Sequence, residues 1–291
     1  MTRMLAFVAA LLLTAITVSS ACVAQSSQPL QFTIEPRPTD AVHLRFERER
    51  NGRRDSNWET SFQPAELSGL DMAALQSPGT RPLRFAIVRE AGRVDCSGTG
   101  GNRMAHGSCT MTPNAEFNRF LAAHGIKAPS NEDSFGMIAL DVHRQLVDVL
   151  ARAHYPTPSV EKLIELTAVD VTPAYIDGLA AAGYRPQTLD GLVQFAALKV
   201  TPDYIGSFVR AGYANLPPDE IVESKALNVT PEFIAGFERI GYGRLPVDTL
   251  VQLKALDITP DYVRAVAQGG KLPSTDHLVQ LRAVTDDLRK H

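Results

Sequence analysis

The chain has 291 residues, of which 44% are hydrophobic and 21% charged, and its formal net charge at pH 7 is −3. Residues 159–291 carry 13 Lys and Arg against 17 Asp and Glu, and the basic residues are spread singly. A nucleic-acid-binding surface needs a basic stripe, and docking on an anionic membrane surface needs clustered Lys or Arg. The charge balance therefore argues against both kinds of partner.

Residues 1–24 have the pattern of a secretory signal peptide. Arg3 gives a positive start, an almost wholly apolar stretch follows, and small residues come after it. The apolar stretch is short for a membrane span, so we expect no stable span once the signal is removed. We expect cleavage after Ala24. The alternative is a lipoprotein modified at Cys22, where Ser19 stands in the position that normally holds an aliphatic residue. The expected location is the periplasm or the medium.

Residues 25–127 predict a β-rich domain with a closing helix. Period-two alternation of apolar and polar residues is the pattern of half-buried strands. This pattern predicts strands at 30–34, 42–46, 58–62 and 83–88. Thr112-Pro113-Asn114 then begins a helix that ends at Gly125.

A hairpin is predicted near the end of this domain. Strands at 94–98 and 107–111 flank a glycine-rich turn at 98–103, which places Cys96 opposite Cys109. Two cysteines in an exported chain predict one disulfide, because metal or redox pairs normally lie closer together with further ligands at short offsets. The glycines also allow a phosphate-loop interpretation, but such a loop needs a following helix and usually a Lys-Ser or Lys-Thr pair.

Residues 134–291 contain a repeat with a period of 29 residues. Self-similarity at this period is typical of stacked supersecondary units that build one core. Thr-Pro and Gly-Tyr pairs recur in one register at Thr172-Pro173, Thr201-Pro202, Thr230-Pro231 and Thr259-Pro260, and at Gly183-Tyr184, Gly212-Tyr213 and Gly241-Tyr242.

Capping chemistry explains these recurring residues. Threonine suits a helix N-cap, proline the first helical position, and glycine the left-handed residue that ends a helix, with the tyrosine folding back on the last turn. A second short helix completes each unit, and Ser224 breaks its apolar pattern in one copy. We expect units near 137–158, 159–187, 188–216, 217–245 and 246–273, with a cap at 274–291.

The predicted fold class is α+β. An N-terminal antiparallel β domain with a disulfide hairpin precedes an all-α array of 29-residue helix-turn-helix repeats. The polar link at 128–133 is the expected domain boundary.

The chain also resembles a known group of proteins. The hairpin with Thr112-Pro-Asn-Ala-Glu-Phe117, and repeats such as Val200-Thr-Pro-Asp-Tyr204, are similar to exported bacterial proteins of unassigned function. Similar segments follow the membrane metallopeptidase domain of antirepressor-type sensors, the class that includes beta-lactam sensors. The resemblance covers roughly residues 40–285 and implies an extracytoplasmic sensing or interaction module. In this sequence no His is followed by Glu, so the peptidase's His-Glu-x-x-His site does not carry over.

We therefore expect a non-catalytic protein-interaction or regulatory module without cofactor or metal, whose partner is an envelope protein. The candidate binding residues are Lys199, Asn228 and Asp257, which with Asp170 precede the apolar residue before each Thr-Pro pair and vary in type. Neutral drift would produce the same variation. The oligomeric state stays open.

Three alternatives remain. The module could inhibit or regulate an envelope enzyme, or the β domain could bind cell-wall glycan through Trp58. A hydrolase is the third. Ser159 and Lys162 match the Ser-x-x-Lys signature but lack its companion motifs, and Ser159 suits a helix cap. His106 lies near Ser108 without an identifiable acidic partner.

Overall fold

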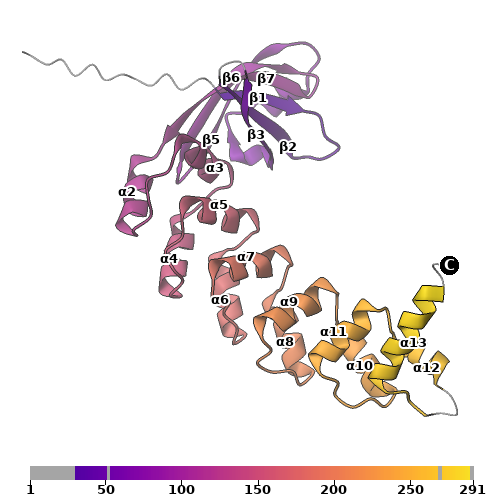
Figure 1. Cartoon of the computed structure of the whole chain (residues 1–291). Helices are drawn as coiled ribbons and strands as arrows, with labels where there is room; N and C mark the ends of the chain where they lie inside the picture. The colour runs from indigo at the N-terminus through magenta and orange to yellow at the C-terminus, as the bar shows by residue number, and fades with distance from the viewer. Residues whose placement is uncertain (1–29, 51–52, 268–270, 289–291) are drawn as a thin grey trace, which may run out of the picture.

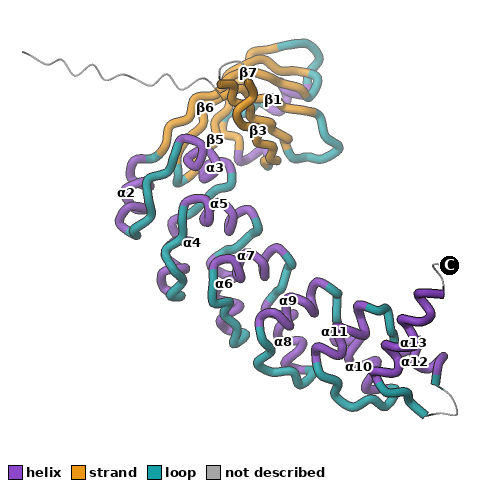
Figure 2. The backbone as a smooth tube through the Cα atoms, viewed as in Figure 1, coloured by secondary structure: helices purple, strands orange, loops and turns teal. Residues whose placement is uncertain are grey.

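The structure, a computed structural model, describes residues 30–50, 53–267 and 271–288. The expected signal peptide, with Ala24 and Cys22, lies outside the described residues. An antiparallel sheet forms one end of the molecule, and a curved run of helices follows it (Figure 1). Figure 2 shows the same division, with the strands confined to the N-terminal part. The predicted α+β class is confirmed.

The sheet has seven strands in the order β3-β2-β1-β7-β6-β5-β4, with antiparallel neighbours throughout. A short 3-10 turn, η1, and a short helix, α1, connect β3 to β4 and β4 to β5. The bounds are β1 Leu30–Glu35, β2 Val42–Arg50, β3 Arg53–Phe62, η1 Pro64–Glu66, β4 Leu67–Ser68, α1 Met72–Gln76, β5 Arg81–Arg89, β6 Gly92–Gly101 and β7 Met104–Pro113.

The alternation of the strands places their apolar side chains on one face. Phe32 and Phe46 are almost fully buried there, and the ring of Phe32 lies edge-to-face on Phe85 at 5.1 Å. Cys96 and Cys109 face each other across β6 and β7, and their disulfide is confirmed with an S–S distance of 2.04 Å. The hydrophobic core of the sheet thus includes the disulfide.

The hairpin tip differs from the predicted turn at 98–103. Only Asn102 and Arg103 form the turn, with φ of 53° and 64°, the backbone of a two-residue primed hairpin turn. The glycines before them belong to β6. A Cβ at Gly98 would lie 2.1 Å from the backbone oxygen of His106, so glycine is needed for close strand approach and not for a turn. The phosphate-loop interpretation is wrong, because these residues pair in the sheet and a strand follows them.

Twelve helices follow β7 in the described part of the chain, and most have nine residues. We call the even-numbered helices α2 to α12 the even helices and the odd-numbered helices α3 to α13 the odd helices. The even helices begin every 29 residues, and the odd helices from α3 to α11 do the same. The bounds are α2 Ala115–Ala123, α3 Asn131–Ala139, α4 Arg144–Arg152, α5 Val160–Ala168, α6 Pro173–Ala181, α7 Leu189–Ala197, α8 Pro202–Arg210, α9 Pro218–Ala226, α10 Pro231–Arg239, α11 Val247–Ala255, α12 Pro260–Val266 and α13 Thr275–Leu288.

The 29-residue register begins at α2, which the sequence analysis assigns to the β domain as its closing helix. Asn114 caps α2 through its side chain, in the place that threonine takes in later units. Gly125, with φ of 74°, ends it, and the N–H of Ile126 bonds back to the carbonyl of Leu121 at 3.0 Å. Helix α2 therefore has the same start and stop chemistry as the other even helices.

The even helices of the repeats start and stop at the recurring residues. The hydroxyls of Thr172, Thr201, Thr230 and Thr259 each accept the N–H three residues on, and a proline follows each of them. Gly183, Gly212 and Gly241 have φ of 76°, 88° and 106°. The N–H of the next tyrosine bonds to the carbonyl five residues earlier, as in a Schellman motif.

The helices form two layers, since odd helices pack on neighbouring odd helices and even on even. The odd layer lies on the inner side of the arc in Figure 1. Tyrosine hydroxyls tie successive units together: Tyr175 donates to the carbonyl of Val200 at 2.8 Å, and Tyr204 to that of Val229 at 3.0 Å. Helices α6 and α8 thus each supply a hydrogen bond to the following unit.

Helix α3 packs against the apolar face of the sheet. The ring of Phe135 lies edge-to-face on Phe46 at 5.1 Å and on Trp58 at 5.6 Å. A Cβ at Gly136 would lie 2.9 Å from the Trp58 ring, so the helix approaches closely. One hydrophobic core therefore runs from the sheet through the first helix pairs as far as Ile221 in α9.

Candidate interaction edge of the repeat array

The predicted binding residues occupy equivalent places at the ends of odd helices. Lys199, Asn228 and Asp257 follow α7, α9 and α11 with φ of 55°, 55° and 51°, and Asp141 and Asp170 follow α3 and α5 with φ of 62° and 60°. All five are therefore left-handed, a conformation that residues with a side chain seldom adopt. We call these five residues the ladder.

Helix ending explains the backbone of the ladder. The N–H of Lys199 bonds to the carbonyl of Ala196 at 2.8 Å, and the N–H of Val200 bonds to that of Phe195 at 2.8 Å. The same pair of bonds ends the other odd helices that the ladder follows, and the residue after each ladder position is buried. The ladder position is thus a fixed C-terminal cap with an outward-facing side chain.

The type of residue that takes the left-handed conformation after a helix differs between the two layers. Even helices end at glycine in four described cases, Gly125, Gly183, Gly212 and Gly241, with His154 after α4 as the exception. The five ladder positions hold aspartate, asparagine or lysine. A left-handed residue with a Cβ costs about 1–2 kcal/mol, a cost that Asn and Asp partly escape and Lys does not. The odd helices therefore keep side chains where the backbone favours glycine.

Most of the ladder is open to solvent. Asp170, Lys199, Asn228 and Asp257 are exposed. Within the described residues, the side chains of Asp170, Lys199 and Asn228 have no hydrogen-bond or ion-pair partner, whereas Asp257 lies 3.4 Å from the guanidinium of Arg282. Asp170, Lys199 and Asn228 are thus available to another molecule at successive steps along one edge.

A second column of side chains lies beside the ladder, at the second residue of the even helices. Asp203, Glu232 and Asp261 fall there in α8, α10 and α12. A hydrogen bond from its own backbone and one from the Thr230 hydroxyl lower the pKa of Glu232, so it carries its charge. Of the eight residues named in these two columns, six are acidic, Asn228 is neutral and Lys199 is basic.

A polar junction lies where the β5–β6 turn meets the start of α4. Glu90 accepts the backbone N–H of Arg144 at 3.1 Å and contacts the ring of His143 at 3.3 Å. Burial acts to raise the pKa of Glu90, but the hydrogen bonds from Arg144 and His143 and their charges lower it overall. Arg89 lies 3.5 Å from the ladder residue Asp141 in the same junction. The first step of the ladder is therefore tied to the sheet.

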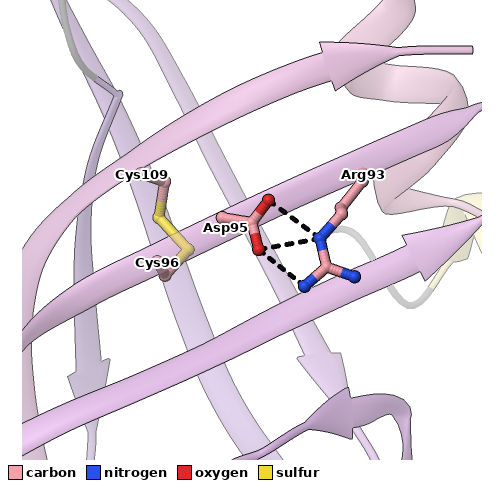
Figure 3. The surroundings of a disulfide bond; sticks show 4 residues. All are labelled: Arg93, Asp95, Cys96 and Cys109. Carbon is pink, nitrogen blue, oxygen red and sulfur yellow. Dashed lines mark hydrogen bonds and ion pairs between the residues drawn. A yellow bond between two sulfur atoms is a disulfide. The ribbon is translucent and has the colours of Figure 1, made fainter.

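The disulfide and a surface ion pair lie close together on the β6–β7 hairpin (Figure 3), and they point to opposite faces of the sheet because Cys96 is buried while the adjacent Asp95 is exposed. Cys96 and Cys109 are buried, while Arg93 donates to both carboxylate oxygens of Asp95 at 2.7 and 2.8 Å. These hydrogen bonds raise the pKa of Arg93 and lower that of Asp95. The burial of both cysteines in the apolar core fits a structural crosslink.

The Ser-x-x-Lys match has a structural explanation. The hydroxyl of Ser159 accepts the N–H of Lys162 at 3.2 Å and caps α5, at the side of a surface hollow of about 490 Å³. Hydrogen bonds to Asp190, at 2.6 Å, and to Glu165 raise the pKa of Lys162. Lys162 is therefore a paired ammonium and unsuited to activate the serine as a base.

Strand pairing assembles a polar cluster that the sequence analysis missed. The hydroxyl of Ser61 lies 3.2 Å from Nδ1 of His43, and a carboxylate oxygen of Glu59 lies 3.6 Å from Nε2 of the same ring. Arg45 holds Glu59 at 2.7 Å and lowers its pKa. These residues come from β2 and β3 and lie on the polar face of the sheet. The sequence contains no local signal for this cluster.

His106 and Trp58, the other candidate residues, have ordinary surroundings. Nε2 of His106 lies 3.5 Å from the hydroxyl of Thr99 on the neighbouring strand. Trp58 is half-buried against Phe135, which leaves only part of its ring open for stacking. Among the described residues, no group of three or more His, Cys, Asp and Glu side chains is placed to hold a metal ion.

Comparison with known proteins found no counterpart for this arrangement. Neither protein-family models, nor curated proteins, nor solved structures gave a significant match to the chain. Of the helices that the structure describes, none is long and apolar enough to cross a membrane.

Proposed function

We propose that this protein is a non-catalytic extracytoplasmic interaction or regulatory module that binds an envelope protein along the ladder edge of its repeat array. The observation that carries the proposal is the absence of glycine from all five described ladder positions, although their left-handed backbone favours it. Backbone strain that persists against such a preference is often found at functional sites. In this proposal, the ladder positions hold side chains and not glycine because a partner protein contacts those side chains.

The architecture supports this proposal in two ways. Stacked helix pairs present an extended surface, and repeat proteins commonly use such surfaces for binding. The ladder places one variable side chain per unit on a fixed backbone, so the edge combines a rigid frame with a distinct residue at each step. A partner segment lying along it would contact Asp170, Lys199, Asn228 and Asp257 in turn.

An extracytoplasmic location is part of the proposal. The disulfide is compatible with an oxidising compartment, and the pattern of residues 1–24 is that of a signal peptide. The resemblance to exported proteins and to the extracytoplasmic segments of antirepressor-type peptidases points the same way. A partner in the envelope follows from that location, and inhibition or regulation of an envelope enzyme is the same binding with a catalytic partner.

A hydrolase is the second candidate, favoured by one observation. Ser61, His43 and Glu59 form a hydroxyl–imidazole–carboxylate series across two strands. Acyl transfer also needs donors aimed at the developing oxyanion. Hydrolysis of an activated ester by the full chain that is lost in Ser61→Ala would support this candidate, and equal rates for the two proteins would remove it.

The binding proposal is tested by crosslinked capture from envelope extract with the full mature chain. The Lys199→Gly, Asn228→Gly and Asp257→Gly triple variant keeps the backbone and removes the side chains. Gly183→Asn is the matched control at the end of an even helix, where an added Cβ meets no atom within 4 Å among the described residues. We expect a partner captured by wild type and control to be lost by the triple variant.

Equal capture of the same partner by wild type and the triple variant would contradict the choice of this edge. In that case the even layer or the sheet would be the next surface to test. Failure of all three proteins to capture a partner would argue against protein binding under these conditions and favour the ester assay.

A further inference from the structure

Ser224 stands out within the core of the array. The equivalent positions of the neighbouring odd helices hold Leu166 in α5, Phe195 in α7 and Leu253 in α11, all of them buried. Ser224 is 0% exposed, and within the described residues its hydroxyl has no hydrogen-bond partner. A small polar side chain thus takes the place of a large apolar one.

The hydrophobic core divides at the same place. One cluster runs from the sheet through the first helix pairs and ends with Ile205 in α8 and Ile221 in α9. A second cluster begins with Phe208 and continues through Val229 to the last helix pair, and the half-buried Tyr204 and Leu216 pack against both clusters. The division passes through α8 and α9, where Ser224 lies between Ile221 and Val229 in sequence.

The physical consequence is a weak interface. A serine is too short to join the apolar side chains on its two sides, and a buried hydroxyl without a partner loses the hydrogen bonds that water would supply. In a repeat array the interface between neighbours carries much of the stability. Among the described residues, half-buried side chains therefore join the two clusters at α8 and α9, where the position equivalent to Leu166, Phe195 and Leu253 holds no apolar side chain.

We propose that Ser224 marks a seam that divides the array into two blocks, and that the C-terminal block opens as a unit of its own. The N-terminal block comprises the sheet and the helices through α7, and the C-terminal block comprises α10 to α13, with α8 and α9 forming the seam. Sub-global opening of contiguous elements is a common property of native proteins. In this chain Ser224 determines where along the array the opening occurs.

The seam crosses the ladder. Lys199 ends α7 in the N-terminal block, whereas Asp257 ends α11 in the C-terminal block. Opening changes the distance between these two ladder residues, so a partner that contacts both would close the seam. This consequence rests on the proposed function. The seam itself depends only on the packing and is tested without any partner.

Native-state hydrogen exchange of the full chain, with its disulfide intact, tests the seam. In the wild type we expect the amides of α10 and α11 to exchange through a shared opening that leaves α5 and α7 protected. Ser224→Leu joins the two clusters and should raise the protection of α10 and α11 by about tenfold or more relative to α5 and α7. Ser224→Ala removes the unpartnered hydroxyl without adding bulk. It should slightly reduce the difference in exchange protection between α10 and α11 on one side and α5 and α7 on the other.

Exchange of both blocks through a single opening in the wild type would overturn the proposal, whatever the variants do. If Ser224→Leu fails to fold because the site cannot hold its bulk, the exchange protection of the two blocks in the wild type and in Ser224→Ala still tests the seam. A larger difference between the blocks in Ser224→Ala than in the wild type would also contradict the seam. Loss of partner capture has no influence on either readout.

Discussion

Replacement of Lys199 by glycine is predicted to stabilise the protein. The lysine has φ of 55°, an exposed side chain and no hydrogen-bond or ion-pair partner among the described residues, so its removal forfeits no polar interaction. Relief of the left-handed strain is worth about 1–2 kcal/mol. The greater freedom of glycine in the unfolded chain offsets about 0.5–1 kcal/mol of this gain. The expected net gain is about 0.5–1 kcal/mol.

Thermal and urea unfolding measure this gain. For a chain of this size it corresponds to a rise in Tm of about 1–4 °C. The control is Lys199→Ala, which removes the same charge and length but keeps the Cβ that causes the strain. We expect its stability to lie within about 0.5 kcal/mol of the wild type. A Lys199→Gly variant no more stable than Lys199→Ala would refute the strain argument and, with it, the main support for the ladder.

Three further predictions follow from the caps and crosslinks. Thr230→Ala should lower the free energy of unfolding by about 1 kcal/mol through loss of the α10 cap, whereas Thr230→Ser should restore most of it; equal losses in denaturant titration would contradict the capping role. Because the pKa of Glu90 is lower in the folded chain, its stabilising effect is present above about pH 4.3 and disappears as pH falls through the lowered value. As pH falls from about 4.3 through the lowered pKa, the free energy of unfolding of the wild type should therefore decrease more than that of Glu90→Gln. Equal decreases in the two proteins would contradict this prediction. Reduction of Cys96–Cys109, which are 13 residues apart, should cost about 3 kcal/mol, and an unchanged midpoint in reductant would be inconsistent with a structural disulfide.

Local interactions explain what the sequence predicts well. Helix caps act over three to five residues, so the threonine, proline and glycine of each unit are visible together in the sequence. Strand alternation is equally local. The disulfide between opposed cysteines can be predicted once the hairpin that contains them is recognised. Helix α2 escaped notice as a repeat member because Asn114 replaces the threonine and no proline follows it, although Gly125 stands in register.

Non-local pairing explains what the sequence leaves hidden. The cluster of Ser61, His43 and Glu59 exists only because β2 pairs with β3 in one particular register. The sequence marks Asp170, Lys199, Asn228 and Asp257 as one variable position, but it hides their left-handed backbone for a different reason. Glycine is the usual mark of a left-handed helix end, and Lys199 gives no such signal. Ser224 interrupts the apolar pattern in the sequence, but only the packing reveals that the core divides there.

The most direct test of the central claim compares Tm and partner capture for the same set of purified proteins. We predict that the triple variant Lys199→Gly, Asn228→Gly and Asp257→Gly melts at or above the temperature of the wild type and no longer retains the envelope partner, while Gly183→Asn still retains it. A triple variant that keeps full capture at an equal or higher Tm would contradict the claim that the ladder binds a partner.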